Sequence, residues 1–376
     1  MVNVTLSLMI GPAVPVPAPR EVIDALTSVS VSHDQTRSGF QISFAVSKNS
    51  LLQRTLLPAG YFDPVTTRVV IILTMSGFPH VLMDGLVTQQ QLQPSSNPGE
   101  STLTITGEDL SLAMDIVSIT RPFPAMPAVA AINLILAPYL LLGIVPVVIP
   151  PIVPMIKSPT EGWPAQTNIT DRAYLNQLAA ECGYIFFVRP GPAPLTSIAY
   201  FGPDANIPVP QHALSINMDA QTNVDSLSFT NNGLAKKLRV YLINDPVTRK
   251  IPIPIPVPNI NAFKPPLGLR PTPPSKIEFA TDVAKLKPDA VANKILGFLL
   301  DKDNSAAITA SGSLDTMRYG HVLQSRALVG VRGAGLAYDG MYYVDSVSHS
   351  LKKGSYTQNF TLSRDGLISN TPRVLP

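Results

Sequence analysis

The chain of 376 residues is poor in cysteine, tryptophan and charge. Its one cysteine, Cys182, excludes an intrachain disulfide framework and a cysteine-ligated metal cluster. Charged residues make up 14% of the chain, against about 25% in an average soluble protein. A chain with so little charge has less charged surface than a free monomer usually shows. We therefore expect other subunits to cover much of its exterior.

The basic residues form no concentrated patch in the sequence. The net charge is only +3, and lysine and arginine never occur more than two in a row. Trp163 and the tyrosines do not alternate with basic residues, as a stacking surface for nucleic acid would require. Nucleic-acid binding is therefore not expected.

The sequence also lacks the motifs of the common enzyme sites. It contains no P-loop, no GxSxG elbow and no GxGxxG motif. His33 and Asp34 are the only adjacent histidine–acid pair, and we expect them in a solvated turn between strands. Four further histidines are isolated in the sequence and lack metal-ligand spacing: His80, His212, His321 and His349. We expect no catalytic residue, no cofactor, no metal site and no enzyme activity.

Two other sequence patterns resemble functional motifs, but a structural interpretation explains each of them better. Glu108, Asp109 and Asp115 resemble the paired carboxylates of a glycosidase, yet GEDLS fits a strand exit whose acids cap a helical turn better. The glycine-rich stretch from Gly330 to Gly335 has no βα unit around it. We interpret it as a loop in which the backbone turns tightly.

Residues 122–156 carry no charge, and length and hydropathy alone suggest a transmembrane helix. Prolines interrupt this stretch, and its longest proline-free run is Ala128–Ala137. Each interior proline removes a backbone hydrogen bond that lipid does not replace. We expect a buried helix near Ala128–Leu142 followed by an extended segment. Membrane contact through 128–156 is the alternative.

The N-terminal residues 1–20 have no basic stretch before their apolar part, so they make a poor secretory signal. We interpret them as an extended arm. The absence of a signal favours synthesis and assembly in the cytoplasm.

A first block rich in strands is expected from about Glu21 to Asp115. Phe40–Val46 alternates apolar and polar residues, whereas Arg68–Met75 (RVVIILTM) has an apolar run without alternation and predicts a strand buried on both faces. Asp84–Gly85 is a turn candidate, and Ser101–Thr106 alternates again.

A second block begins near Ala213 and ends in the clearest strand pattern of the chain. Met341–Ser350 and Ser355–Ser363 are expected strands, with turn signals at Asp339–Gly340 and Lys353–Gly354. A proline tract at 251–275 interrupts this block and favours extended or edge conformations. A helix is expected after it, with Pro288 in its first turn and one face made of Val291, Ile295, Phe298 and Leu299.

Between the blocks, Asn168–Phe201 predicts a helix and a hairpin. Thr170 is the expected N-cap and Asp171 places a negative charge in the first turn. Gly183 is the expected stop, followed by the buried strand Tyr184–Val188. One helix face is expected to be buried, made of Leu175, Leu178, Ala179 and Cys182.

The fold class predicted from these patterns is mainly β (α+β), with two antiparallel β-barrels on either side of a small α/β middle region. The expected divisions are a 1–20 arm, a 21–121 barrel, a 122–212 middle region, a 213–368 barrel with an insertion at about 251–304, and a 369–376 tail.

The helix-and-hairpin segment resembles the phage late control D family, the hubs of contractile-tail baseplates. The matching positions are Thr170, Asp171, Tyr174, Leu175, Leu178, Ala179, Gly183, Tyr184, Phe186 and Val188. Residues 101–115 resemble the end of that family's first barrel, through Gly107 and Asp109 among others. Residues 331–367 resemble its C-terminal hairpin, at Gly333, Gly335, Tyr338, Gly340, Tyr343, Val344, Val347, His349, Tyr356, Phe360, Leu362 and Arg364.

The resemblance implies a homotrimer whose six barrels form a ring between a hexameric inner tube and a trimeric spike. Its implied partners are the inner tube protein, a separate spike protein and other baseplate components. It also implies a phage tail or injection particle assembled in the cytoplasm of the producing bacterium. A membrane-associated adaptor of such a machine and a peptidoglycan-degrading hub enzyme are the alternatives.

Overall fold

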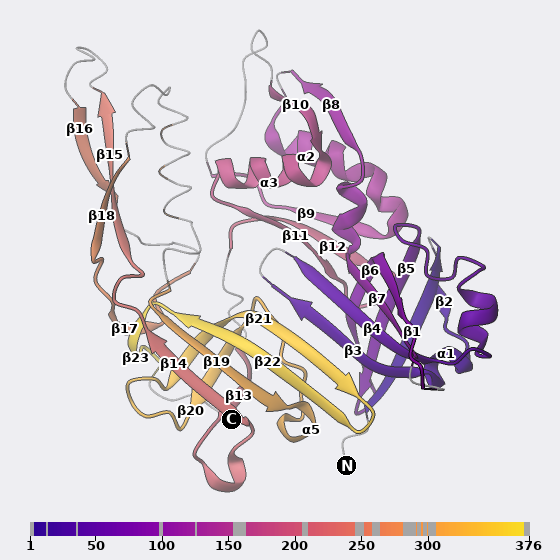
Figure 1. Cartoon of the computed structure of the whole chain (residues 1–376). Coiled ribbons are helices and arrows are strands. Elements are labelled where there is room, and N and C mark those ends of the chain that lie inside the picture. Colours follow the sequence, from indigo (N-terminus) through magenta and orange to yellow (C-terminus); the bar gives the residue numbers. More distant parts are fainter. Residues whose placement is uncertain are drawn as a thin grey trace.

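The computed structural model confirms a mainly β fold with large antiparallel sheets (Figure 1). It describes residues 4–12, 14–34, 37–97, 101–124, 126–152, 163–204, 210–244, 252–257, 264–280, 291, 295, 299 and 306–371. The division of the chain into domains at the expected boundaries stays a prediction.

One 13-stranded sheet contains strands from both β blocks. Its main path runs through β14 (Ser226–Asn231), β19 (Ile308–Asp315), β22 (Ser355–Arg364), β21 (Gly340–Lys352), β3 (Leu26–His33), β4 (Ser38–Val46), β7 (Ser101–Asp109), β6 (Phe78–Gln93), β5 (Thr67–Met75), β1 (Val4–Pro12) and β2 (Val16–Pro17). Off this path, β20 (Leu328–Arg332) pairs with both β21 and β13 (Pro210–Ser215). The antiparallel pairing of β3 with β21 joins the two blocks.

The alternation of apolar and polar residues that predicted the strands corresponds to an alternation of buried and exposed side chains in the structure. In β4 the side chains of Phe40, Ile42, Phe44 and Val46 are buried while Gln41 and Ala45 are exposed. The apolar strand β5 is buried over most of its length, as expected of a strand covered on both faces. The predicted C-terminal hairpin is also confirmed, because β21 and β22 are joined by a turn at Lys353–Gly354. Gly354 has a φ of 80°, which suits glycine there.

The predicted turn at Asp84–Gly85 is wrong, because β6 runs straight through both residues. The chain turns earlier, at Ser76 and Gly77, which both have positive φ. Gly85 is needed for another reason: a Cβ on it would lie 2.1 Å from the backbone oxygen of Glu108 on β7. The aspartate–glycine pair therefore reflects close contact between strands and a buried charge.

The interpretation of the N-terminal residues as an arm is wrong for residues 4–12. Residues 4–12 are extended, but they form β1 and pair with β5 along its whole length. Leu8 and Ile10 are buried in the core of the first block. A strand held by this many backbone hydrogen bonds is an integral part of the sheet.

The middle region packs around its own apolar core. The apolar stretch forms helix α2 (Ala128–Leu136), the 3-10 helix η3 (Ala137–Leu142) and strand β9 (Ile144–Val148). The expected buried helix is confirmed for α2, but η3 contains no buried residue, so the second half of the expected helix at Ala128–Leu142 lies on the surface. Strand β9 pairs in parallel with β12 (Ser197–Gly202), which pairs with β11 (Ile185–Pro190). Helix α3 (Asp171–Glu181) covers this core, and β8 (Ser118–Phe123) pairs with β10 (Trp163–Thr170) beside it. Among the described residues, no helix has both the length and the apolar character to cross a membrane.

The proline-rich insertion forms a projecting sheet, seen at the upper left of Figure 1. Strand β15 (Lys237–Asn244) lies between β16 (Pro252–Val257) and β18 (Lys276–Ala280), so the proline-bearing β16 is an edge strand, as predicted. Val291 and the half-buried Ile295 and Leu299 are helical and pack against this sheet, whereas the expected Pro288 and Phe298 lie outside the described residues. Below it, β17 (Gly268–Pro271) pairs with β23 (Gly366–Ser369).

Gly107 lies where two strands and an aromatic ring converge. It pairs with Phe40 on β4 and with Val87 on β6. A Cβ there would lie 2.3 Å from both the Phe40 ring and the backbone oxygen of Leu86. We expect Gly107→Ala to lower the free energy of unfolding by about 1–3 kcal/mol, because the strands must separate to admit the methyl group. Urea unfolding measures this change.

Gly233 is the matched control, because a Cβ there would meet nothing within 4 Å. Gly233→Ala should change stability by less than about 0.5 kcal/mol. Equal effects of the two substitutions would contradict the steric explanation.

Candidate functional site

The acids that suggested a hydrolase are tied into structural contacts. Asp109 accepts hydrogen bonds from the backbone N–H of Ser111 (2.9 Å) and of Ser38 (2.9 Å), so it caps the 3-10 helix η2 (Leu110–Met114). Glu108 and Asp115 lie 3.2 and 3.7 Å from Arg172 of α3. The strand-exit interpretation is confirmed, and two of the three carboxylates share one guanidinium. Within the described ranges, no three metal-ligating side chains come together to form an ion site.

Asp171 is the centre of a buried polar junction at the start of α3. Its carboxylate accepts hydrogen bonds from the Tyr139 hydroxyl (2.8 Å) and the Gln166 amide (2.8 Å), and Arg121 lies 3.4 Å away. Burial, together with the hydrogen bond to Asp171, raises the pKa of Tyr139, so the phenol stays a donor. This junction joins α3 to η3, β8 and β10.

The predicted helix signals lie around this junction and are confirmed. The Thr170 hydroxyl accepts from the backbone N–H of Ala173 (3.2 Å), as an N-cap does, and donates to Asp115 (2.6 Å). Tyr174 stacks on Phe123 of β8 with ring centroids 5.8 Å apart. Gly183 ends the helix with a φ of 69°. The expected buried face is present: Leu175, Leu178, Ala179 and Cys182 are all buried, and so is Tyr184 beyond the stop. Burial raises the pKa of Cys182 to about 12, which fits a packing role rather than a reactive thiol.

A second buried ion pair, which the sequence analysis missed, connects the first block with the middle region. Arg68 of β5 makes a bidentate contact with Asp84 of β6, with both distances 2.7 Å. Arg68 also donates to the backbone oxygen of Leu195 (3.3 Å), and the Ser197 hydroxyl lies 3.4 Å from Asp84. A charged residue within the apolar strand at 68–75 was the available signal, because a buried arginine needs a partner.

In the C-terminal block, Arg364 holds the chain that precedes β21. It donates to the backbone oxygens of Asp339 and Ala337 (both 2.8 Å) and stacks on Tyr342, 4.4 Å from the ring centroid. Gly333 and Gly335 have φ of 84° and 89°, so the tight turn expected near them is correct. The stretch before them is not loop, because Gly330 lies inside β20.

The other C-terminal positions serve the core or an adjoining polar contact. Val344 and Phe360 are buried in the core of the second block, and Gly340 has a φ of 124° beside Ser369. The Tyr343 hydroxyl donates to Asp204 (3.1 Å), which also binds Lys264. Each of these positions has a packing contact or a structural hydrogen bond. Their assignment as family positions stays a prediction.

The histidines are not isolated in space, and His33 is not in a solvated turn. His33 is the last residue of β3, and its ring packs edge-on against His349 of β21 with centroids 5.5 Å apart. His349 Nδ1 lies 2.8 Å from the Tyr356 hydroxyl and 3.2 Å from the Gln358 amide nitrogen, so it is the acceptor and the ring is neutral. His212 stacks on His321 with centroids 4.6 Å apart. Strand pairing between distant segments created these contacts, which no spacing in the sequence reveals.

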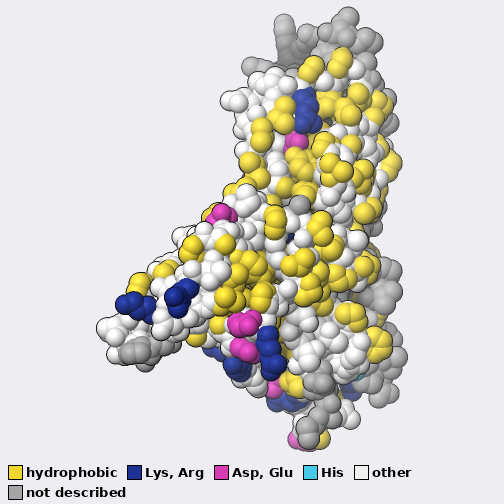
Figure 2. Space-filling model, turned by 90° about the vertical axis from the view of Figure 1, so that its right-hand side faces the viewer, with side chains coloured by type: hydrophobic (Ala, Val, Ile, Leu, Met, Phe, Trp, Pro, Cys, Tyr) yellow, Lys and Arg dark blue, Asp and Glu magenta, His cyan; other side chains and the backbone are white. Residues whose placement is uncertain are grey.

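The middle region has a largely apolar outer surface. Figure 2 shows one face of the molecule, on which hydrophobic side chains are widespread and charged ones are few. Leu141 of η3 is 93% exposed. Other exposed apolar side chains of this region are Leu134, Leu140, Val145, Val147, Ile149 and Ile152. We call these seven residues the η3 surface.

Comparison with family models and with curated proteins gives no match. The fold, however, is similar to that of solved tail proteins over nearly the whole chain. A tail protein from Neisseria meningitidis MC58 matches with a TM-score of 0.62 and 13% identity, covering 96% of this chain and 98% of that one. A 43 kDa tail protein of prophage MuSo2 from Shewanella oneidensis matches with a TM-score of 0.60 and 11% identity, covering 97% and 100%.

A third match is to an Escherichia coli protein described as a component of the type VI secretion system with structural similarity to the T4 bacteriophage tail proteins gp27 and gp5. Its TM-score is 0.55 at 10% identity, and the match covers 93% of this chain and 77% of that one. At such low identities these likenesses establish the fold. The chain has the fold of phage tail proteins.

Asp84 offers a test of the Arg68–Asp84 pair. We expect Asp84→Asn to lower the free energy of unfolding by about 3–5 kcal/mol, because it leaves a buried guanidinium without its counter-charge. Replacing both partners with apolar residues, in Arg68→Met/Asp84→Leu, should recover most of this loss. Urea unfolding measures both.

The exposed pair Arg20–Asp24 on helix α1 (Arg20–Asp24) is the control. Asp24→Asn should leave the unfolding midpoint nearly unchanged. A double variant as unstable as Asp84→Asn would contradict the assigned role of the pair.

The contact between His33 and His349 predicts that the folded protein loses stability in acid. Burial and the nearby charge of Arg326 lower the pKa of His33 to about 4, and burial with the nearby His33 holds the pKa of His349 well below its usual range. Below the ordinary histidine pKa of about 6.5, the unfolded chain binds protons that the folded chain does not. Stability should therefore fall as the pH drops from about 6.5 to about 4, by at most about 1.4 kcal/mol per pH unit and histidine.

Urea midpoints between about pH 7 and about pH 5 measure this slope. His349→Gln should flatten it, whereas Lys48→Gln, at an exposed lysine, should not. A slope unchanged by His349→Gln would refute the assignment.

Proposed function

We propose that this chain is the structural hub of a contractile-tail or injection-system baseplate. In this role three copies form a ring that joins the hexameric inner tube to the central trimeric spike, alongside other baseplate components. The observation that carries the proposal is the likeness in fold to two tail proteins, which extends over almost the full length of all three chains. Such end-to-end likeness supports a common structural role better than a shared single domain would.

The polar residues of the described chain support a structural role. Arg68, Asp84, Asp171 and Arg172 are all buried and paired with one another or with neighbours, so their charges hold strands and helices in place. Catalytic groups usually lie in a cleft with a pKa suited to proton transfer. A non-enzymatic tail component fits these contacts better than a peptidoglycan-degrading enzyme does.

The η3 surface supports assembly with other subunits. Leucines as exposed as Leu141 gain free energy when a neighbour covers them, and exposed apolar side chains on a monomer promote association. We assign this surface to a contact between copies in the trimer. The low charge of the whole chain is in line with such coverage.

Light scattering coupled to size-exclusion chromatography tests the trimer. We expect a mass three times that of the chain over the working range of the column, because a tightly bound trimer dissociates only on dilution far below that range. Leu141→Asp should reduce the trimer fraction, since a carboxylate in the contact loses its hydration. A protein that is monomeric in its folded, unaggregated form would contradict the hub.

Leu336 is the matched control, because it is 90% exposed and lies outside the η3 surface. Leu336→Asp should leave the trimer intact. If both variants stay trimeric, the η3 surface does not form the trimer contact. Flotation of the intact protein with liposomes, lost in Leu141→Asp, would instead favour the membrane-associated adaptor.

A further inference from the structure

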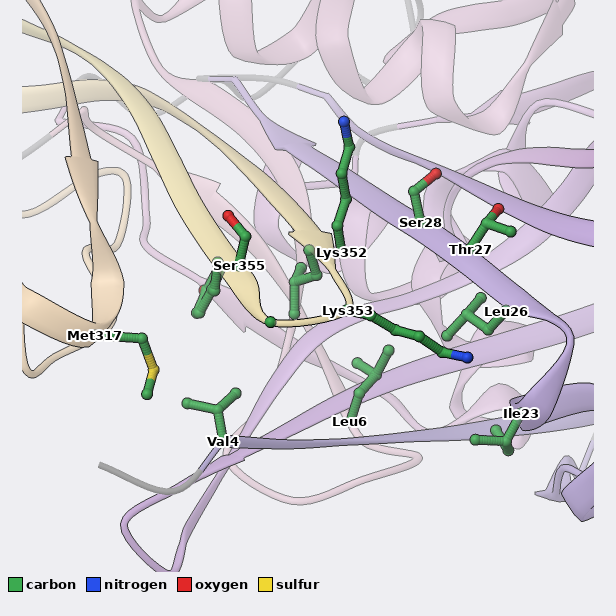
Figure 3. A pocket seen from close by; sticks show the side chains of 13 residues that line it. Val4, Leu6, Ile23, Leu26, Thr27, Ser28, Met317, Lys352, Lys353 and Ser355 are labelled. Carbon is green, nitrogen blue, oxygen red and sulfur yellow. The ribbon is translucent and has the colours of Figure 1, made fainter. Parts of the chain in front are cut away.

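A pocket of about 450 Å³ opens where the first and second β blocks meet (Figure 3). Its walls come from β1, from the start of β3 and from the tip of the β21–β22 hairpin. Val4 and Leu6 of β1 lie on one side, and Leu26 and Leu351 continue its apolar lining. Leu351 belongs to the core of the first block, and the other three side chains pack against that core, so the base of the pocket is part of it.

Strand β1 has an open edge beside this pocket. One side of β1 pairs with β5 from Val4 to Pro12. On its other side, β2 pairs only with Met9 and Ile10. Within the described residues, no strand pairs with that side at 4–7. An unpaired strand edge presents backbone N–H and C=O groups to any extended segment that approaches it.

The rim of the pocket is cationic. Lys352 and Lys353 extend from the hairpin tip in different directions (Figure 3), and no acidic side chain lines the pocket. In the described part of the chain neither ammonium group has an ion-pair partner. Two lysines above an apolar lining favour an occupant that is apolar and carries negative charge.

We propose that this pocket binds an extended acidic peptide segment of a partner protein, which adds a strand to the open edge of β1. The segment's backbone would pair with residues 4–7, and its alternate apolar side chains would fill the pocket. Its carboxylates would lie at Lys352 and Lys353. Strand addition takes its affinity from backbone hydrogen bonds and its specificity from pockets for alternate side chains.

The open edge of β1 favours a peptide over a fatty acid as the ligand of this pocket. A fatty acid would also satisfy an apolar pocket with a cationic rim, but it has no backbone to pair with β1. The burial pattern of β1 suits a strand partner, because Val4 and Leu6 point inward while Thr5 and Ser7 are exposed. The inference concerns a different surface from the trimer contact and does not depend on the hub assignment.

The probe is a dye-labelled peptide of eight residues in which valine and threonine alternate and two aspartates form the C-terminal end. Fluorescence anisotropy with the full chain should give saturable binding with a Kd below about 1 mM, weakened by salt. The double variant Lys352→Glu/Lys353→Glu should raise the Kd at least about tenfold. Lys48→Glu, at an exposed lysine of the same block that does not line the pocket, should leave it unchanged.

Hydrogen exchange reports where the probe binds. Saturating peptide should slow exchange of the amides at 4–7 and at the hairpin tip. The proposal is overturned by no saturable binding up to about 1 mM, by equal binding of a peptide ending in two lysines, or by equal weakening in Lys48→Glu. It also fails if octanoate displaces the peptide and the amides at 4–7 stay unprotected, because the pocket is then a fatty-acid site. The oligomeric mass is measured in a separate experiment, so the trimer can fail while the peptide site holds, and the peptide site can fail while the trimer holds.

Discussion

The pairing of β3 with β21 is the contact on which the rest of the molecule depends. It places residues 28–33 against residues 347–352, almost at opposite ends of the chain, in one antiparallel ladder. Because of it, the two β blocks share one sheet rather than meeting only through side chains. The His33–His349 contact and the hydrogen bond from Arg326 to the backbone oxygen of Asp34 both lie at this ladder. Closing such a long loop is costly in entropy, so a continuous set of backbone hydrogen bonds is an effective means of holding it.

The local structure could be predicted well wherever one period or one cap determined it. The alternation at Phe40–Val46, the Thr170 cap and the Lys353–Gly354 turn each follow from a few neighbouring residues. The same local reasoning failed at Asp84–Gly85. There the aspartate forms an ion pair with Arg68 on the neighbouring strand, and the glycine leaves room for the backbone of β7. It failed again at residues 4–12, whose partner strand β5 lies far along the chain. Local signals identify strands joined by a tight turn, but they do not show which strands pair when they lie far apart in the sequence.

The candidate sites depend on that missing information. Neither the Arg68–Asp84 pair nor the pocket beside β1 corresponds to a motif, because each is made by strands that only the sheet order brings together. The resemblance of three segments, at 101–115, 171–191 and 331–367, to baseplate hubs was the sequence signal that reached beyond local structure, and the likeness in fold to solved tail proteins now supports it. The likeness in fold at 13% identity or less shows that one backbone arrangement is compatible with very different side chains.

The distribution of charge connects the fold to assembly. Charged residues make up only 14% of the chain, and several of them are buried. The buried ones include Asp171, Arg172, Arg364 and the Arg68–Asp84 pair. Buried ion pairs add little net stability, but they penalise every alternative packing that separates them, so they favour one arrangement of strands and helices. The outer surface is left with few charges and with exposed leucines such as Leu141. A tightly paired interior combined with exposed apolar side chains is compatible with the proposed hub, because the shape of a subunit is then fixed before assembly and its surface gains free energy when neighbours cover it.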